Sequence, residues 1–218
     1  MSISVDILSD PICPWCYIGK TRLDRALAER PDHPLAFHWR PFQLNPDMPA
    51  GGMDRREYLE HKFGGREGAL QVYGAILEAA KADGLDLRFD KIARTPNTID
   101  AHRLIRWASS AHAQTPVVEA LFRLYFEEGV DISDHAVLAE VAEQAGMDRA
   151  VVERLLASDA DLELVREEDA TARRMGVSGV PTFIIDGRYV VPGAQSPEMW
   201  LRAIDEIVAS AERQTGAH

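Results

Sequence analysis

The first forty residues alternate between extended and helical patterns. Residues 3–8 alternate β-branched and polar side chains, which predicts a β-strand. A helix is expected to begin near Cys13, because Pro14 suits the first helical position, where no backbone N–H is needed. Residues 35–42 have the composition of a second strand. A strand–helix–strand unit favours parallel pairing of its two strands through the helical crossover.

The middle of the chain is predicted to be helical. From residue 54 to residue 156 the apolar positions recur with helical spacing. One such stripe consists of Leu70, Tyr73, Leu77 and Ala80. No sequence repeat links the successive stripes, so we expect a compact helical bundle and not a repeat array.

The last sixty residues return to mixed structure. An acidic helix is predicted over residues 161–175. Residues 180–185 and 189–191 are predicted strands, and Asp186-Gly187 between them is typical of a two-residue hairpin turn. Ser196-Pro197 then has the pattern of a helix cap followed by proline at the first position. The overall prediction is an α/β protein with a helical insertion.

Composition and charge exclude several classes of function. The chain has 218 residues, of which 46% are hydrophobic, and its net charge is −11. Nonspecific nucleic-acid binding needs clustered cations, so we expect no nucleic-acid partner. No apolar run reaches the roughly 20 residues that cross a bilayer, so we expect no membrane insertion. The first residues lack a basic segment, and Asp6 and Asp10 interrupt the apolar stretch, so a signal peptide is not predicted and the cytoplasm is the expected compartment.

Both cysteines of the chain lie in one Cys-x-x-Cys motif, Cys13-Pro14-Trp15-Cys16. At a helix start, the first thiol lies near unpaired N–H groups and the positive end of the helix dipole, which favour the nucleophilic thiolate. The second thiol, one turn later, is placed to attack a mixed disulfide and release the substrate. We therefore assign Cys13 as the nucleophile and Cys16 as the resolving cysteine.

Three other roles of the cysteine pair compete with this assignment. Cys13, Cys16, His33 and His38 follow each other in the order of a zinc finger, but the predicted helix lies between the two pairs, so no metal site is predicted. A structural disulfide is a poor explanation for a solitary pair in a chain of this size. Inert buried thiols leave the proline at the helix start unexplained.

Two motifs together indicate a family. The segment 10–19 (DPICPWCYIG) and the segment 176–183 (GVSGVPTF) resemble the DsbA-type branch of the thioredoxin superfamily. With segment 97–104 (NTIDAHRL), the first motif resembles the FrnE-like subgroup, which is related to 2-hydroxychromene-2-carboxylate isomerases and kappa-class glutathione transferases. The resemblance implies a thioredoxin domain of residues 1–43 and 160–218, interrupted by a helical insertion domain of residues 44–159.

The resemblance also implies roles for individual residues. Pro181 is expected to be cis and to pack beside the cysteines, and the backbone of Val180 to pair with an extended substrate. Pro14 and Trp15 are expected to contact the substrate. Asn97 is a further substrate-binding candidate or a helix cap. His102, in the same segment, is expected to be a polar residue with its hydrogen bonds satisfied.

These observations predict a disulfide oxidoreductase or isomerase that acts on a protein or small-molecule disulfide. We expect no bound cofactor, although glutathione is a candidate co-substrate. The alternative is a glutathione-dependent isomerase or transferase for aromatic or polyketide-like substrates, although those relatives usually carry serine where Cys13 stands. A zinc-stabilised binding module is a third interpretation. The sequence leaves the oligomeric state open.

Overall fold

The structure is a computed structural model that describes residues 2–215, with side chains up to residue 210. One four-stranded sheet has the order β2-β1-β5-β6. Its strands are β1 (Ile3–Ser9), β2 (Leu35–Pro41), β5 (Thr182–Ile185) and β6 (Tyr189–Pro192). The parallel pairing of β1 with β2 through α1 (Pro14–Glu29) confirms the predicted strand–helix–strand unit. Both β5 and β6 pair antiparallel to their neighbours.

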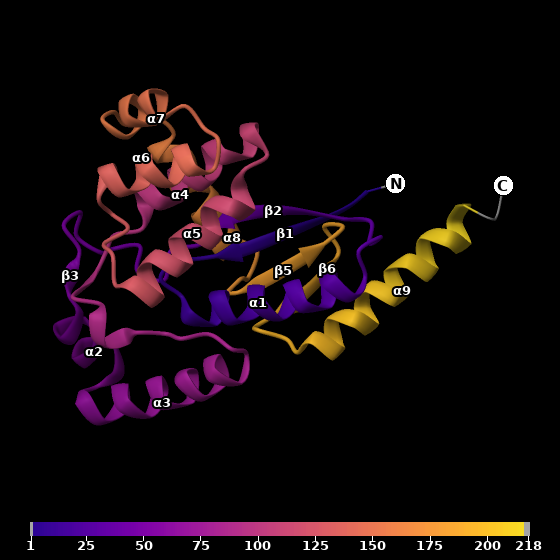
Figure 1. Cartoon of the computed structure of the whole chain (residues 1–218), viewed down its shortest axis with the longest axis horizontal. Coiled ribbons are helices and arrows are strands. Elements are labelled where there is room, and N and C mark those ends of the chain that lie inside the picture. Colours follow the sequence, from indigo (N-terminus) through magenta and orange to yellow (C-terminus); the bar gives the residue numbers. More distant parts are fainter. Residues whose placement is uncertain (1, 216–218) are drawn as a thin grey trace.

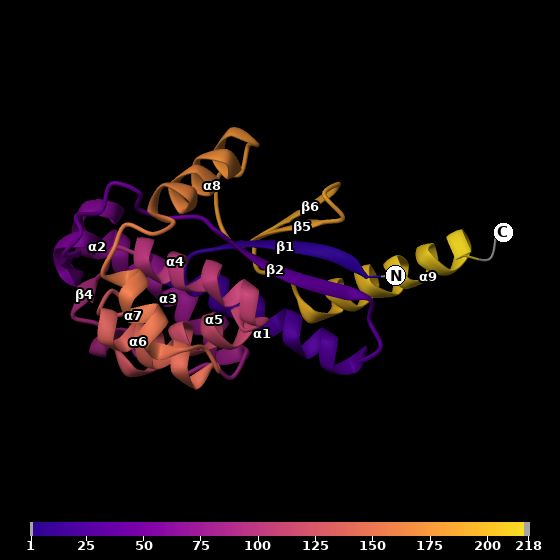
Figure 2. The same ribbon diagram turned by 90° about the horizontal axis from the view of Figure 1, so that it is seen from above.

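Helices cover both sides of this sheet. On one face lie α1 and α9 (Pro197–Thr215), and α8 (Leu162–Arg174) lies on the opposite side (Figure 2). The ring of Phe183 on β5 packs edge-on against Trp200 of α9, with ring centroids 4.7 Å apart. This contact packs α9 onto β5 within the C-terminal strand–strand–helix half, and the pairing of β5 with β1 joins that half to the N-terminal one.

The long middle segment forms a helical body at the end of the sheet where α1 begins, and the two chain termini lie at the other end (Figure 1). Its helices are α2 (Arg55–Phe63), α3 (Arg66–Ala82), α4 (Ile99–Ala108), α5 (Gln114–Arg123), α6 (His135–Gln144) and α7 (Arg149–Leu156). Short elements connect them: β3 (Met53–Asp54), β4 (Arg94–Thr95), the 3-10 turns η1 (Phe89–Lys91) and η2 (Ser109–Ala111), and the π-helix η3 (Leu124–Glu128). The order of elements confirms an α/β fold with a helical insertion. The limits of the two domains at residues 43/44 and 159/160 stay predictions.

Two local predictions were wrong. In α3 the predicted stripe is inward only in part: Ala80 is buried, but Leu70 is 62% exposed and Leu77 is 42% exposed. Ala69 and Ile76, each one residue earlier, are buried in their place, because packing against the rest of the molecule selects among positions of similar helical spacing. The second wrong prediction is the two-residue turn at Asp186-Gly187. The hairpin after β5 has three connecting residues, because Ile185 pairs with Tyr189. No helix within residues 2–215 is long and apolar enough to cross a bilayer.

Candidate active site

The two cysteines lie at the start of α1, where the sequence places them. Cys13 is the N-cap, with extended backbone angles, and Pro14 occupies the first turn. The carbonyl oxygen of Cys13 accepts the N–H groups of Cys16 at 3.0 Å and Tyr17 at 3.3 Å. Both thiols are free. A dithiol in this arrangement can be oxidised to a disulfide with little change in the helix, since one turn separates the residues.

The environments of the two thiols differ. Cys13 is 4% exposed and Cys16 is 1% exposed. Burial raises the pKa of the Cys16 thiol well above its ordinary value, and the neighbouring Cys13 raises it further, while the Ser9 hydroxyl and the Asp10 backbone N–H act in the opposite direction. Cys16 is therefore a protonated thiol at neutral pH in the reduced protein. This asymmetry agrees with the assignment of Cys13 as the nucleophile.

A distant loop completes the site. The Val180–Pro181 bond is cis, as expected. The Cys13 thiol donates a hydrogen bond to the Val180 carbonyl oxygen at 3.5 Å. Pro181 packs against α1 at Gly19, where a Cβ atom would lie 3.0 Å from the Cγ atom of Pro181. A cavity of about 400 Å³ adjoins this loop and is lined by residues between 175 and 193. The hydrogen bond to Val180 places this loop beside Cys13, although neither cysteine lines the cavity.

Asp10 supports the turn that leads into Cys13, a role that the sequence did not reveal. Its carboxylate is fully buried and accepts the N–H groups of Leu44 at 2.7 Å and Ile12 at 3.3 Å. Its carbonyl oxygen accepts the N–H of Cys13 at 2.9 Å. Burial raises the pKa of Asp10 to about 6, although these backbone hydrogen bonds lower it. Asp10 therefore connects the cysteine turn to the segment after β2.

The family follows from this geometry together with the comparisons. Residues 4–205 match the model of the DSBA-like thioredoxin domain. The chain belongs to the DSBA-like thioredoxin domain family. A solved structure described as a probable DsbA oxidoreductase, from Streptomyces coelicolor, is 32% identical, with a TM-score of 0.82 over 94% of this chain and 89% of that one. The predicted family and fold are confirmed.

Two more distant structures share the fold. The cytosolic disulfide reductase DsbM from Pseudomonas aeruginosa, solved with GSH, is 19% identical, with a TM-score of 0.65 over 94% of this chain and 99% of that one. A 2-hydroxychromene-2-carboxylate isomerase is 22% identical, with a TM-score of 0.67 over 98% of both chains. At these identities the likeness concerns the fold, which DsbA-type proteins and the isomerase therefore have in common.

The other predicted substrate-binding residues are Pro14, Trp15 and Asn97. Pro14 and Trp15 are half-buried beside the cysteines. Asn97 is held by the backbone at both ends of its amide, because its oxygen accepts from Ile99 N–H at 2.9 Å and its nitrogen donates to the Met48 carbonyl oxygen at 2.6 Å. Asn97 thus lies one residue before the N-cap Thr98 and binds the first N–H of α4, while its role toward a substrate stays a prediction.

The expectation for His102 was wrong. Its Nε2 atom is buried without a hydrogen-bond partner and lies 3.9 Å from Oδ1 of Asp10. Burial lowers the pKa of His102 to about 4, so the ring is neutral at pH 7. The helix periodicity placed His102 on α4, but only the tertiary structure shows that the carboxylates of Asp10 and Asp169 lie near its ring.

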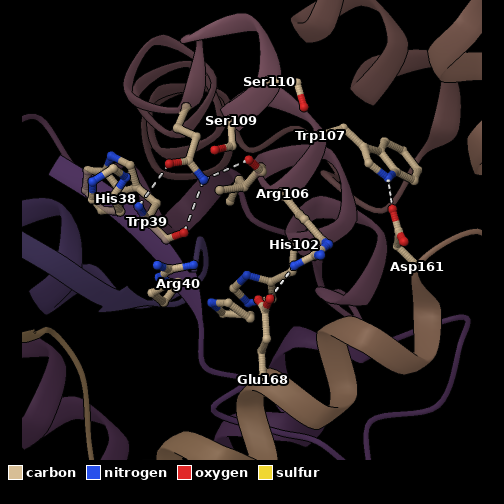
Figure 3. A pocket seen from close by; sticks show the side chains of 13 residues that line it. His38, Trp39, Arg40, His102, Arg106, Trp107, Ser109, Ser110, Asp161 and Glu168 are labelled. Atoms are coloured by element: carbon tan, nitrogen blue, oxygen red, sulfur yellow. Dashed lines mark hydrogen bonds and ion pairs between the residues drawn. The ribbon is translucent and has the colours of Figure 1, made fainter.

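A second cavity of about 400 Å³ lies between β2, α4 and α8 on the far side of His102 (Figure 3). Its polar side chains are largely paired with one another. Arg106 forms an ion pair with Glu168, and the Trp107 ring N–H donates to Asp161 at 2.8 Å. Neither cysteine lines this cavity, so it is separate from the thiol surface of the DsbA-type domain.

The zinc-finger interpretation does not fit the fold. Cys13 and Cys16 lie at the start of α1, whereas His33 and His38 follow its end, and the 13 helical residues 17–29 lie between the two pairs. A helix of that length spans about 20 Å, far beyond the reach of one metal ion. In the part of the chain that is described, no group of three or more metal-ligating side chains occurs.

Proposed function

We propose that this protein is a thiol–disulfide oxidoreductase that reduces or rearranges disulfides through Cys13 and Cys16. One observation carries the proposal: two free thiols at a helix start, the first of them hydrogen-bonded to the carbonyl oxygen before Pro181. The oxidoreductases among its relatives support the same chemistry. The environment in which it acts is proposed to be the reducing cytosol, as for the cytosolic reductase DsbM.

The reaction balances as follows. The Cys13 thiolate attacks one sulfur of the substrate disulfide, that S–S bond breaks, and the first substrate thiolate leaves. A mixed disulfide now joins Cys13 to the substrate. Cys16 loses its proton and attacks the Cys13 sulfur, which releases the second substrate thiolate and leaves a Cys13–Cys16 disulfide. The substrate gains two electrons, and two molecules of a thiol such as glutathione restore the dithiol.

The surroundings assist particular steps. The Ser9 hydroxyl and the Asp10 N–H favour the Cys16 thiolate, which the second step requires. Val180 offers its backbone to an extended substrate, and Pro181 holds that backbone against α1. Pro14 and Trp15 supply apolar surface beside the sulfurs. No bound cofactor is needed for these steps, and glutathione is a co-substrate in this scheme.

Trapping of substrates tests the proposal. In Cys16→Ser the first step remains possible but the mixed disulfide cannot be resolved, so partners should stay attached to Cys13 and be released by a reductant. Cys13→Ser/Cys16→Ser is the matched control. Recovery of the same proteins or small thiols on both variants would refute the proposal.

A glutathione-dependent isomerase remains the alternative, since that enzyme class shares the fold. Isomerisation needs no resolving thiol, whereas redox exchange needs both cysteines. Cys13→Ser should therefore abolish disulfide reduction without creating isomerase activity on hydroxychromene-type compounds. If the wild type and Cys13→Ser isomerised such compounds equally well, the isomerase function would be the correct one.

A further inference from the structure

Arg55, at the start of α2, is a buried cation without an acidic partner. It is 7% exposed, and its Nε atom has no hydrogen-bond partner. Its other nitrogens donate only to hydroxyl groups, those of Thr95 and Tyr125 at 3.2 Å each and that of Tyr73 at 2.5 Å. Among the described side chains, no carboxylate oxygen lies within the 4.0 Å of an ion pair. A buried charge without a counter-charge is unfavourable, so this one calls for an explanation outside packing.

The hydroxyl of Tyr73 links this cation to the surface. Its oxygen accepts from Arg55, so its own hydrogen must point elsewhere, and no described residue accepts it. Tyr125 differs, because it is fully buried and donates to the Arg94 carbonyl oxygen at 3.4 Å. Tyr73 is only half-buried. Its hydroxyl is therefore a free hydrogen-bond donor, and the positive charge of Arg55 on its oxygen strengthens that donor.

The Tyr73 ring is held rigidly and lies near the cysteines. It packs edge-on against Phe89, with centroids 4.6 Å apart, and Arg55 lies 5.3 Å from its ring centre. α3 packs on α1 and lies beside it in Figure 1. Phe89 packs in turn on Phe126, and Phe126 stacks on Tyr17, which follows Cys16 in α1, with centroids 6.1 Å apart in each pair. Burial raises the pKa of Tyr73, so it is a neutral hydrogen-bond donor, and this chain of rings joins it to the helix turn that carries the cysteines.

This donor suits a negatively charged acceptor. The chain as a whole has a net charge of −11, which repels anions in general. The charge of Arg55, which no carboxylate neutralises, attracts anions locally at Tyr73 despite this general repulsion. Salt screens the field of a buried charge only weakly. A carboxylate on the substrate would supply the counter-charge that Arg55 lacks.

We propose that Tyr73, positioned by Arg55, binds a carboxylate of a small acidic thiol or disulfide peptide while its sulfur reacts at Cys13. The inference rests on the proposed oxidoreductase function and names its substrate class, to which glutathione belongs. The helical insertion thereby supplies a specificity-determining residue to chemistry that the thioredoxin half performs.

Two disulfides that differ only in charge test this assignment. The reduced protein is mixed with glutathione disulfide or with its ester, in which the carboxylates are masked, and oxidation of the cysteine pair is followed in single turnover. The wild type should react faster with the acidic disulfide. Tyr73→Phe should slow that reaction about tenfold, the effect of one hydrogen bond to a charged group, and leave the ester rate unchanged.

Further variants separate binding from folding. Arg55→Lys keeps the charge but loses the fork of donors, so it should slow only the acidic disulfide, and it should add nothing in a Tyr73→Phe background. Tyr189→Phe, on the exposed strand β6, is the matched control and should behave as wild type. A wild type that reacts with neither disulfide would refute the oxidoreductase function itself. If Tyr73→Phe slowed both disulfides equally, or neither, only the carboxylate site would be refuted.

Discussion

The sulfur of Cys13 lies 3.5 Å from the carbonyl oxygen of Val180, although 167 positions separate the two residues in the chain. The thiol is the donor in this hydrogen bond. When Cys13 ionises, the donor is lost and the carbonyl oxygen becomes free to accept a backbone N–H of a bound peptide. In the proposed mechanism, the ionisation that makes Cys13 a nucleophile therefore also frees a carbonyl oxygen beside it for the substrate.

The two thiols are expected to react in a fixed order. Because burial raises the pKa of Cys16, a neutral alkylating reagent at pH 7 should label Cys13 first. Cys13→Ala should abolish disulfide reduction, whereas Cys16→Ala should accumulate mixed disulfides that intact-mass measurements detect. Peptide mapping that found the label mainly on Cys16 would reverse the assignment.

The close contact between Gly19 and Pro181 predicts a loss of activity without a loss of stability. In Gly19→Ala the new methyl group meets Pro181 at 3.0 Å and must displace the loop by a few tenths of an ångström. The rate of disulfide reduction should fall roughly threefold to tenfold, while the better helix propensity of alanine, about 1 kcal/mol, offsets the strain. Gly74→Ala is the control, since nothing lies within 4 Å of the added atom. Equal rates in the two variants would show that the position of Pro181 does not matter.

Asp10 and His102 should make opposite contributions to stability as the pH changes. The pKa of Asp10 is raised from 3.8 to about 6 in the folded protein. Its contribution to the free energy of unfolding is therefore fully present below pH 3.8 and is lost as the pH rises through 6. The pKa of His102 is lowered from 6.5 to about 4, so its contribution is fully present above pH 6.5 and is lost as the pH falls toward 4. Each amounts to about 3 kcal/mol at about 1.4 kcal/mol per unit, so the two nearly cancel in the wild type.

Single variants should reveal each contribution. Between pH 6.5 and 4, Asp10→Asn should lose stability on acidification relative to wild type, because only the histidine effect remains. His102→Gln should gain stability over the same range. Urea unfolding at several pH values measures both. Parallel pH curves for the wild type and the two variants would mean that neither group is buried as described.

The reduction potential is expected to lie between the reducing and oxidising extremes of about −270 and about −120 mV. The Pro14-Trp15 dipeptide leaves the helix dipole as the main influence on the thiolate, since neither side chain carries the positive charge that histidine can. Equilibration with glutathione buffers gives the value directly. A potential near the oxidising extreme would favour a disulfide-forming enzyme over a reductase or isomerase.

The sequence by itself determined the features that depend on neighbouring residues. The strand before the cysteines, Cys13 as the cap of α1 and Pro14 in its first turn follow from local propensity, and the parallel pairing of β1 with β2 follows from their short helical connection. The roles of the two cysteines stay a prediction from the same local reasoning, because only the first thiol stands at the positive end of the helix dipole.

Only the tertiary structure decided which distant groups meet. The inward face of α3 was ambiguous, because only the neighbouring packing selects among positions of similar helical spacing. The Asp10–His102 pair and the Arg55–Tyr73 contact join segments 92 and 18 positions apart. Periodicity and motifs describe one element at a time. The charge state of a buried group depends instead on what the whole fold places around it.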